Sequence, residues 1–109
     1  MASFSFPHEG TDKKRPVIVL QCDEDNQNKY YPFVLIAPIT TKKLKDVYLQ
    51  DVLLPKGVGG LENESKVLLG ALTAITKVSL IKRLGIVNND LMTQINLKLL
   101  RIIGLLTKH

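Results

Sequence analysis

Two apolar runs near the start of the chain, separated by a polar stretch, dominate the pattern of the sequence. The first occupies residues 16–20, directly after Arg15, and the second occupies residues 31–39, directly before Thr40. Both runs are rich in Val and Ile and have the length of strands that are buried on both faces. The polar residues 23–29 between them are typical of a turn. The pattern predicts an antiparallel hairpin with Arg15 and Thr40 at the same end of a sheet, where a cation and a hydroxyl would suit phosphate chemistry.

Shorter segments predict the elements that precede the C-terminal region. They are an edge strand at 3–6, a polar hairpin region at 46–54, a strand at 65–76, a helical turn at 78–81 and a strand at 82–87. Gly70, inside the third of these, indicates a bulge or a close approach of two backbones. Residues 56–61 are rich in glycine but lack the Gly-Lys-Ser/Thr ending of a phosphate-binding loop, so we interpret them as a loop of low rigidity.

The last part of the chain has the pattern of an amphipathic helix. Residues 88–90, Asn-Asn-Asp, are suitable N-cap residues. An apolar stripe then recurs at helical spacing and consists of Met92, Ile95, Leu99, Ile102, Ile103 and Leu106. Leu97, Leu100 and Leu105 lie away from this stripe and favour an oligomer contact, with a wider core as the alternative. Gly104 weakens the last turn and would end the helix early.

Short strands followed by one long helix predict the fold class. The order indicates a mainly β (α+β) domain, a small and strongly bent sheet or barrel with a C-terminal helix laid on it. The regular alternation of strand and helix that builds a doubly wound sheet is missing, which argues against nucleotide-cofactor folds. The 109 residues suffice for one hydrophobic core, so we expect residues 1–109 to form a single domain.

Composition argues against several classes of protein. Cys22 is the only cysteine, so no intrachain disulfide can form, and one cysteine with two histidines is too few for a typical metal site. We expect Cys22 to be structural rather than nucleophilic. No segment is long and apolar enough to span a bilayer, and residues 1–10 lack the apolar core of a signal peptide. We therefore expect a cytoplasmic protein without a metal or cofactor.

The positive charge is concentrated around the predicted hairpin. The net charge of +5 modestly favours polyanion partners such as RNA, DNA or an acidic protein segment. Basic residues precede the first apolar run and follow the second: Lys13, Lys14 and Arg15, then Lys42, Lys43 and Lys45. The hairpin would bring both groups to one end of the sheet, where they could bind phosphates. The alternative is that they are solvated loop residues.

Two further sets of residues have a functional and a structural interpretation. His8 and Glu9 would suit an acid–base pair, because histidine exchanges protons near neutral pH. Adjacent residues in an extended segment point in opposite directions, however, so a surface loop is the alternative. For Tyr30, Tyr31 and Tyr48 we favour core or rim packing, with stacking on unpaired bases as the alternative.

Several segments, in their order along the chain, resemble the MazF/PemK toxins of bacterial toxin–antitoxin systems. They are Phe4-Ser5-Phe6-Pro7, Lys14-Arg15-Pro16-Val17-Ile18-Val19-Leu20, Val34-Leu35-Ile36-Ala37-Pro38-Ile39-Thr40, Ser65-Lys66-Val67-Leu68 and Leu80-Ile81-Lys82-Arg83-Leu84-Gly85. The resemblance extends from Phe4 to Leu106. The Arg-Pro-Val and Ala-Pro-Ile-Thr segments, in this order and at this spacing, are the part of the resemblance that is most specific for the family.

The resemblance implies a fold, an activity and a partner. The fold is a small SH3-like β-barrel of the MazF/CcdB type with a C-terminal helix, usually a homodimer. The activity is that of an mRNA interferase, a sequence-specific and metal-independent endoribonuclease that cuts single-stranded RNA. The partner is a cognate antitoxin, which lays an acidic, flexible tail over the RNA groove and blocks it.

The resemblance also implies roles for single residues. Arg15 and Thr40 match the catalytic arginine and threonine of the family, and the expected RNA-binding residues are His8, Glu9, Lys13, Lys14, Lys42 and Lys43. Attack of a 2′-hydroxyl on the phosphate builds negative charge, which a guanidinium at Arg15 would stabilise by binding two phosphate oxygens. Thr40 would hydrogen-bond a phosphate oxygen or orient the attacking hydroxyl. A His-Glu pair precedes the arginine in some relatives, although the intervening loop is a residue longer here.

Two departures from the family pattern leave the activity open. Many members begin with a Gly-Asp-Ile/Val strand, where this chain has only residues 1–6. Many also carry an Asp-Gln-x-Arg-Thr-x-Asp motif where this chain has Gly-Ala-Leu-Thr-Ala-Ile-Thr at 70–76. The alternatives to an active ribonuclease are a catalytically weak or inactive binding module for an antitoxin, nucleic acid or a gyrase-type protein target, and a structural dimer whose basic clusters are only surface.

Overall fold

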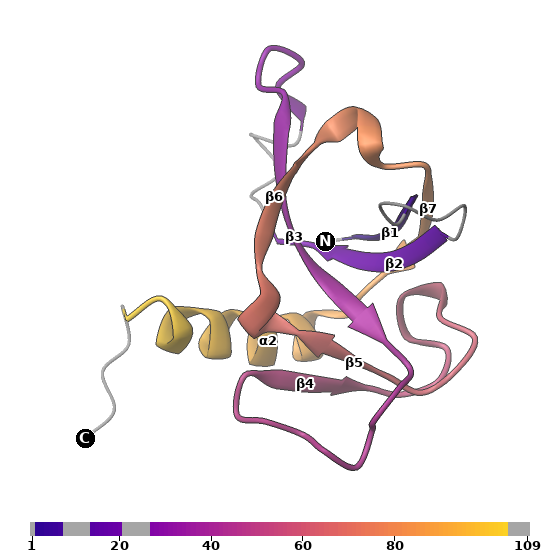
Figure 1. The fold of residues 1–109 in the computed structure, drawn as a ribbon, viewed down its shortest axis with the longest axis vertical. Coiled ribbons are helices and arrows are strands. Elements are labelled where there is room, and N and C mark those ends of the chain that lie inside the picture. The colour runs from indigo at the N-terminus through magenta and orange to yellow at the C-terminus, as the bar shows by residue number, and fades with distance from the viewer. Residues whose placement is uncertain (1, 8–13, 21–26, 105–109) are drawn as a thin grey trace.

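The computed structural model describes residues 2–7, 14–20 and 27–104, which form a bent antiparallel sheet with a C-terminal helix packed beside it (Figure 1). The strands are β1 (Ala2–Pro7), β2 (Lys14–Val19), β3 (Phe33–Thr40), β4 (Asp51–Leu54), β5 (Ser65–Leu68), β6 (Thr73–Thr76) and β7 (Lys82–Ile86). Single 3-10 turns, η1 (Val58–Gly60), η2 (Leu69–Ala71) and η3 (Lys77–Ser79), lie between strands, and the helix is α2 (Asn89–Ile102). The predicted mainly β (α+β) fold class is confirmed.

The strands follow the order β4-β5-β3-β2-β1-β7, and β3 has two partners along the same edge. Its first half pairs with β6, whereas its last two residues, Ile39 and Thr40, pair with β5. In the described part of the chain the outer strands β4 and β7 do not pair with each other. Over the described residues the sheet is therefore bent but not closed, which differs from the SH3-like β-barrel that the family resemblance implies, because its two outer strands do not meet.

The hairpin predicted from the two apolar runs forms the centre of the sheet. β2 and β3 pair antiparallel, with Val17 opposite Pro38 and Val19 opposite Ile36. Val17 and Ile18 point to opposite faces, and both are fully buried. The prediction of strands buried on both faces is therefore confirmed for β2 and for β3 from Val34 to Ile39, whereas residues 31–33 of the second predicted run are exposed.

Two groups of apolar side chains cover the two faces of this hairpin. The larger group lies between the sheet and α2 and contains Ile18, Leu20, Ala37, Ile39, Val52, Leu54, Leu61, Val67, Leu69, Val87, Met92 and Ile95. The smaller group contains Val17, Val19, Val34 and Ile36, with Ile75 and Leu80 packed against it. Because each fully buried aliphatic side chain stabilises the fold by about 1.5–3 kcal/mol, the helix side supplies most of the hydrophobic stabilisation.

Helix α2 begins and ends where the sequence predicts. The Asn88 Oδ1 accepts a hydrogen bond of 2.9 Å from the backbone N–H of Leu91, which is the expected N-cap interaction. The helix ends at Ile102, and Gly104 follows with a φ of 80°, a conformation that costs glycine little. No helix in the described ranges combines the length and hydropathy that a bilayer crossing needs.

The predicted apolar stripe of α2 is confirmed over most of its length. Met92 and Ile95 are buried in the larger core, and Leu99 and Ile102 pack against it. Ile103 is exposed, because it comes after the last helical residue, and Leu106 lies outside the described residues. The two predicted off-stripe residues that the structure describes, Leu97 and Leu100, are exposed as well.

Three elements differ in position or length from those that the sequence predicts. The expected edge position of 3–6 is wrong, because β1 lies between β2 and β7 and pairs with both. Only residues 51–54 of the expected hairpin region 46–54 form a strand. The expected strand 65–76 is interrupted by η2, which moves the chain from one half of β3 to the other. The expected strand at 82–87 is confirmed as β7.

The close backbone approach occurs at a different glycine from the one expected. A Cβ added at Gly70 would only touch the Gln50 side chain at 3.6 Å, an ordinary contact. A Cβ at Gly60 would overlap the carbonyl group of Leu84, and one at Gly85 would overlap the Gly59 backbone. The glycine-rich segment is thus pressed onto β7 and is closed by a backbone bond of 2.9 Å from Gly57 to Leu61. It forms a defined turn rather than an open loop.

Candidate functional site

The two strands of the central hairpin separate at the end that carries Arg15 and Thr40. Their ladder stops at Val17 and Pro38, two residues short of this end. Beyond it, Arg15 pairs with β1 while Thr40 pairs with Lys66 of β5. Arg15 and Thr40 therefore lie at the same end of the sheet, as predicted, on strands that turn toward different partners. We call this end of β2 and β3 the divergent end.

Arg15 carries an unusual polar group. Its side chain is half-buried, and its Nε is enclosed by protein without a hydrogen-bond partner among the described residues. A buried donor without a partner costs about 1–3 kcal/mol, and native proteins seldom keep one. The Arg15 guanidinium therefore has hydrogen-bonding capacity at the divergent end that the described residues do not fully use.

Thr40 has a hydroxyl whose orientation is partly fixed. Its Oγ1 accepts a hydrogen bond of 3.1 Å from the backbone N–H of Lys42, two residues along the chain. This local turn engages a lone pair of the oxygen and leaves the hydroxyl hydrogen available for donation. Thr40 is half-buried. It can therefore donate to a phosphate oxygen without first breaking an internal bond.

The loop from 41 to 50, which follows Thr40, is anchored by a buried lysine. The Lys66 Nζ donates to the backbone carbonyls of Lys43 at 2.9 Å and Asp46 at 2.7 Å. It also lies 3.5 Å from the Asp51 Oδ2, and both side chains are only 5% exposed. The same carboxylate oxygen accepts the backbone N–H of Tyr48 at 3.0 Å. One ion pair thus holds three points of the loop next to the strand that pairs with Thr40.

Sequence analysis did not single out Lys66 or Asp51. The available signal was a charged residue at the start of an apolar run, Ser-Lys-Val-Leu-Leu, where a buried charge needs a partner. The partner, Asp51, is fifteen positions away and is brought close only because β4 and β5 pair, with Val52 opposite Val67. Neither local pattern nor spacing could have identified it.

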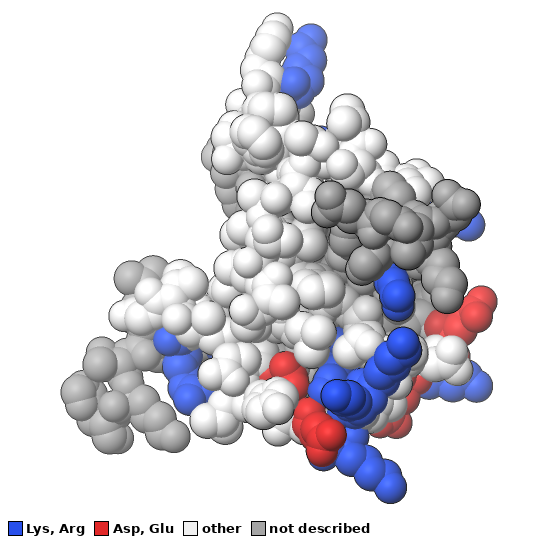
Figure 2. All heavy atoms as spheres, in the orientation of Figure 1, with Lys and Arg blue, Asp and Glu red and all other residues white. Residues whose placement is uncertain are grey.

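The basic residues of the 41–50 loop are exposed. Lys42, Lys43 and Lys45 face solvent, and Lys43 adopts a positive φ of 54°. In Figure 2, Lys and Arg side chains crowd the lower right of the molecule, over the loops that join β3 to β4 and β4 to β5, with acidic side chains among them. The divergent end therefore has cations for phosphates but is not uniformly positive.

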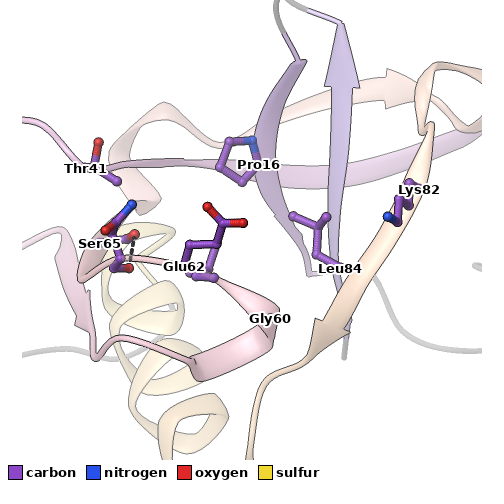
Figure 3. Close-up of a pocket in the computed structure, with 9 residues that line it drawn as sticks. Pro16, Thr41, Gly60, Glu62, Ser65, Lys82 and Leu84 are labelled. Carbon is purple, nitrogen blue, oxygen red and sulfur yellow. Dashed lines mark hydrogen bonds between the residues drawn. The ribbon is translucent and has the colours of Figure 1, made fainter.

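A pocket of about 590 Å³ opens at the divergent end (Figure 3). It is lined by Pro16, Thr41, Gly60, Leu61, Glu62, Asn63, Ser65, Lys82 and Leu84. Pro16 directly follows Arg15, and Thr41 directly follows Thr40. Because side chains alternate along a strand, Pro16 points to the side of β2 opposite to Arg15, so the pocket lies across this end of the sheet from the Arg15 side chain.

Some predicted residues cannot be placed. His8, Glu9 and Lys13 lie outside the described residues, as does Cys22, and Lys14 belongs to β2 without a described side chain. Among the described residues, no group of three or more His, Cys, Asp or Glu side chains is arranged to hold a metal ion.

The three tyrosines lie at the surface, which contradicts core packing but not rim packing or stacking on bases. Tyr30 and Tyr48 are 84% and 71% exposed, which excludes core packing for both. Tyr31 is less exposed and contacts Phe33 edge-on, with ring centroids 6.2 Å apart. Tyr30 and Tyr31 lie near the start of β3, whereas Tyr48 lies in the 41–50 loop. Only Tyr48 is therefore on a segment that follows the divergent end.

The chain matches known proteins in sequence and in fold. A family model described as PemK-like, MazF-like toxin of type II toxin–antitoxin system matches residues 2–103. The Mycobacterium tuberculosis toxin MazF-mt6 is similar in structure, with a TM-score of 0.81 and 20% identity over 98% of this chain and 100% of that one. A mycobacterial endoribonuclease in complex with its cognate antitoxin has a TM-score of 0.80 and 19% identity over 97% of this chain and 94% of the other. No functionally curated protein sequence matches.

The structural matches and the family match support different conclusions. The structural matches have at most 20% identity and show a shared fold. The family match extends over nearly the whole chain and includes both strands of the divergent end. The chain therefore belongs to the PemK-like, MazF-like toxin family of type II toxin–antitoxin systems.

Proposed function

We propose that this toxin is a metal-independent endoribonuclease that cuts single-stranded RNA at the divergent end, with Arg15 and Thr40 as its catalytic residues. The observation that carries the proposal is that the guanidinium of Arg15, whose Nε has no partner among the described residues, lies at the same end of the sheet as the Thr40 hydroxyl. Proteins of the same fold include chains described as mycobacterial endoribonucleases. The family and the chemistry of the site thus support the same activity.

Arg15 and Thr40 would have different roles in the reaction. Attack of a 2′-hydroxyl on the neighbouring phosphorus passes through a five-coordinate state with more negative charge on its oxygens. The Arg15 guanidinium would bind two of these oxygens and stabilise that charge. The Thr40 hydroxyl, with its oxygen already bonded to the Lys42 N–H, would donate its hydrogen to a phosphate oxygen.

The remaining predicted residues would bind the rest of the RNA. Lys42 and Lys43 are exposed beside Thr40 and would bind flanking phosphates. We assign the same role to Lys13 and Lys14 and keep His8 and Glu9 as candidate RNA contacts. These side chains act through position and charge, so their loss would affect binding more than the chemical step.

We further propose that the toxin acts in the cytoplasm as a homodimer that a cognate antitoxin inhibits. A protein of this fold has been solved with its cognate antitoxin. An acidic, flexible antitoxin tail would compete with RNA for Lys42 and Lys43. The exposed Leu97 and Leu100 on α2 are candidates for the dimer contact.

The test is cleavage of a long single-stranded RNA in EDTA by the wild type, Arg15→Ala and Arg101→Ala. Arg101 lies in the last turn of α2, away from the divergent end, and serves as a matched control. We expect the wild type and Arg101→Ala to cut and Arg15→Ala to lose at least 100-fold in kcat/KM. Equal cutting by all three would contradict the role of Arg15. No cutting by any folded variant would favour the non-catalytic binding module.

A further inference from the structure

We propose that the pocket of Figure 3 binds a guanine base of the RNA substrate, and that Glu62 and Lys82 determine this specificity. The proposal rests on the proposed ribonuclease function and adds a base preference to it. Neither residue belongs to the candidate catalytic pair or to the basic clusters identified from the sequence.

The pocket has the size and the walls of a ligand site. Its volume of about 590 Å³ lies within the range of about 300–1,000 Å³ that is typical of small-molecule sites. Pro16, Leu61 and Leu84 provide apolar surface against which a flat base can pack. The contact of Gly60 with Leu84, and of Gly59 with Gly85, fixes one wall against β7.

The pocket lining contains two charged side chains, Glu62 and Lys82. Both residues are exposed, and neither side chain makes a hydrogen bond or ion pair with the described residues. Figure 3 shows Glu62 reaching from the loop toward Pro16, with Lys82 on β7 at the side away from Thr41 and Ser65. The Ser65 hydroxyl already donates to the Asn63 carbonyl at 2.9 Å. Glu62 and Lys82 are therefore the two charged side chains of the pocket lining, and both are available to a ligand.

This pair of groups complements guanine better than the other bases. An ionised carboxylate only accepts hydrogen bonds, and its two oxygens suit two parallel donors. Guanine offers two adjacent donors, N1–H and the N2 amino group, whereas uracil offers one N–H and adenine and cytosine offer one amino group each. A lysine favours the O6 and N7 acceptors of the same base. Glu62 and Lys82 can therefore bind two different edges of one guanine.

The pocket begins one residue along the chain from each proposed catalytic residue, on the other side of the same end of the sheet. Pro16 and Thr41, which line it, each directly follow a proposed catalytic residue. A strand of RNA that crosses the divergent end would place its phosphate at Arg15 and Thr40 and turn an adjacent base into the pocket. An acidic antitoxin segment fits less well, because Glu62 would repel its carboxylates.

The first arm of the test compares cut sites in a random-sequence RNA for the wild type, Glu62→Gln and Glu64→Gln. Glu64 is an exposed carboxylate of the same loop that does not line the pocket, so it is a matched control. We expect the wild type and Glu64→Gln to require guanine at one position next to the cut. Glu62→Gln should lose about 5- to 150-fold of that preference, the range for one bidentate base contact. Cutting by the wild type without a guanine preference would overturn the pocket proposal and leave the ribonuclease proposal intact.

The second arm measures binding without cleavage. A fluorescent RNA with 2′-O-methyl groups throughout is compared with the same RNA in which inosine, which lacks the N2 amino group, replaces guanine. The control is Lys56→Met, which removes an exposed charge outside the pocket lining. We expect inosine to weaken binding to the wild type and to Lys56→Met, and to weaken it much less for Glu62→Gln, whose amide keeps only one acceptor oxygen. An equal loss with inosine in all three variants would contradict the assignment. This arm tests the pocket even if the toxin cuts no RNA. A Glu62→Gln variant that changes affinity only for an acidic peptide would also overturn the proposal.

Discussion

The two ends of strand β3 carry similar side chains but use them differently. Lysines and tyrosines flank both ends, with Lys29, Tyr30 and Tyr31 before Phe33, and Lys42, Lys43 and Tyr48 after Thr40. From composition alone, either end could bind RNA. The structure separates them by the contacts that the cations make.

At the Phe33 end, the cations are engaged within the molecule. The Lys29 Nζ lies 5.4 Å from the centroid of the Tyr30 ring, and the Lys77 Nζ lies 5.7 Å from that of Tyr31. Lys77 also donates to the backbone carbonyl of Asn28 at 2.9 Å. These contacts hold the start of β3 against η3. The positive groups at this end thus contribute to structure.

At the Thr40 end, the exposed cations and the buried cation have separate tasks. The ammonium groups of Lys42, Lys43 and Lys45 make no hydrogen bond or ion pair with the described residues. Lys66, in contrast, is buried and bonded to the backbone of the loop that carries them. A fixed backbone with free charges is pre-organised for a polyanion. The comparison shows that internal contacts, rather than local charge, distinguish the two ends.

The largest expected effect follows from removal of the buried anchor. Lys66→Met leaves the Asp51 carboxylate buried without its cation, so we expect the free energy of unfolding to fall by about 3–5 kcal/mol. The matched change at the other end, Lys77→Met, removes a half-exposed lysine and should cost about 1 kcal/mol or less. Urea denaturation of the two variants measures the difference. A similar decrease in the free energy of unfolding for both variants would contradict the role of Lys66 in anchoring the 41–50 loop.

A second prediction compares the removal of a threonine hydroxyl at each end of β3. Thr40→Val keeps the shape of the side chain but removes the donor, and we expect kcat for RNA cleavage to fall by about 10²-fold. Thr76→Val removes a hydroxyl that lies 2.8 Å from the Ser79 Oγ, near the start of β3, and should leave kcat unchanged. Single-turnover cleavage of one RNA by both variants measures this. Unchanged kcat in Thr40→Val would remove Thr40 from the catalytic pair.

The smallest expected effect concerns the exposed lysines. The double variant Lys42→Gln/Lys43→Gln should weaken RNA binding several-fold near physiological salt. Its slope of log K against log salt should be shallower by about 1.4, since each single-strand phosphate contact contributes about 0.7. The matched variant Lys29→Gln/Lys77→Gln should keep the wild-type slope. If the second variant changed the slope as much as the first, the two ends would be equivalent for RNA.

The parts of the fold that the sequence predicts depend on local patterns. The β2–β3 hairpin follows from two apolar runs, and the start and end of α2 follow from Asn88 and Gly104, because these signals lie within or beside the elements themselves. The central position of β1 could not be predicted, since strand order depends on contacts between distant segments. The division of the expected strand 65–76 into β5 and β6 could not be predicted either. The single 3-10 turn η2 separates them, although the apolar run is continuous in the sequence.

The candidate site shows the same limit. Arg15 and Thr40 were found because each ends a predicted strand and because the family resemblance assigns them a role. The ion pair of Lys66 with Asp51 and the pocket around Glu62 and Lys82 were missed, because each combines residues from different parts of the chain. The glycines at 59–60 and 85 were the only local sign that two backbones meet there.

The most direct test of the central claim is to locate bound RNA by NMR. An isotope-labelled toxin is titrated with an RNA that spans its mapped cut site and carries a 2′-deoxy substitution at the attacking nucleotide, so that it cannot be cleaved. We predict the largest amide shifts at Arg15 and across residues 40–45, with residues 28–33 and Lys77 unaffected. Shifts centred on residues 28–33, or spread evenly over both ends of β3, would contradict the assignment of the divergent end as the RNA-cleaving site.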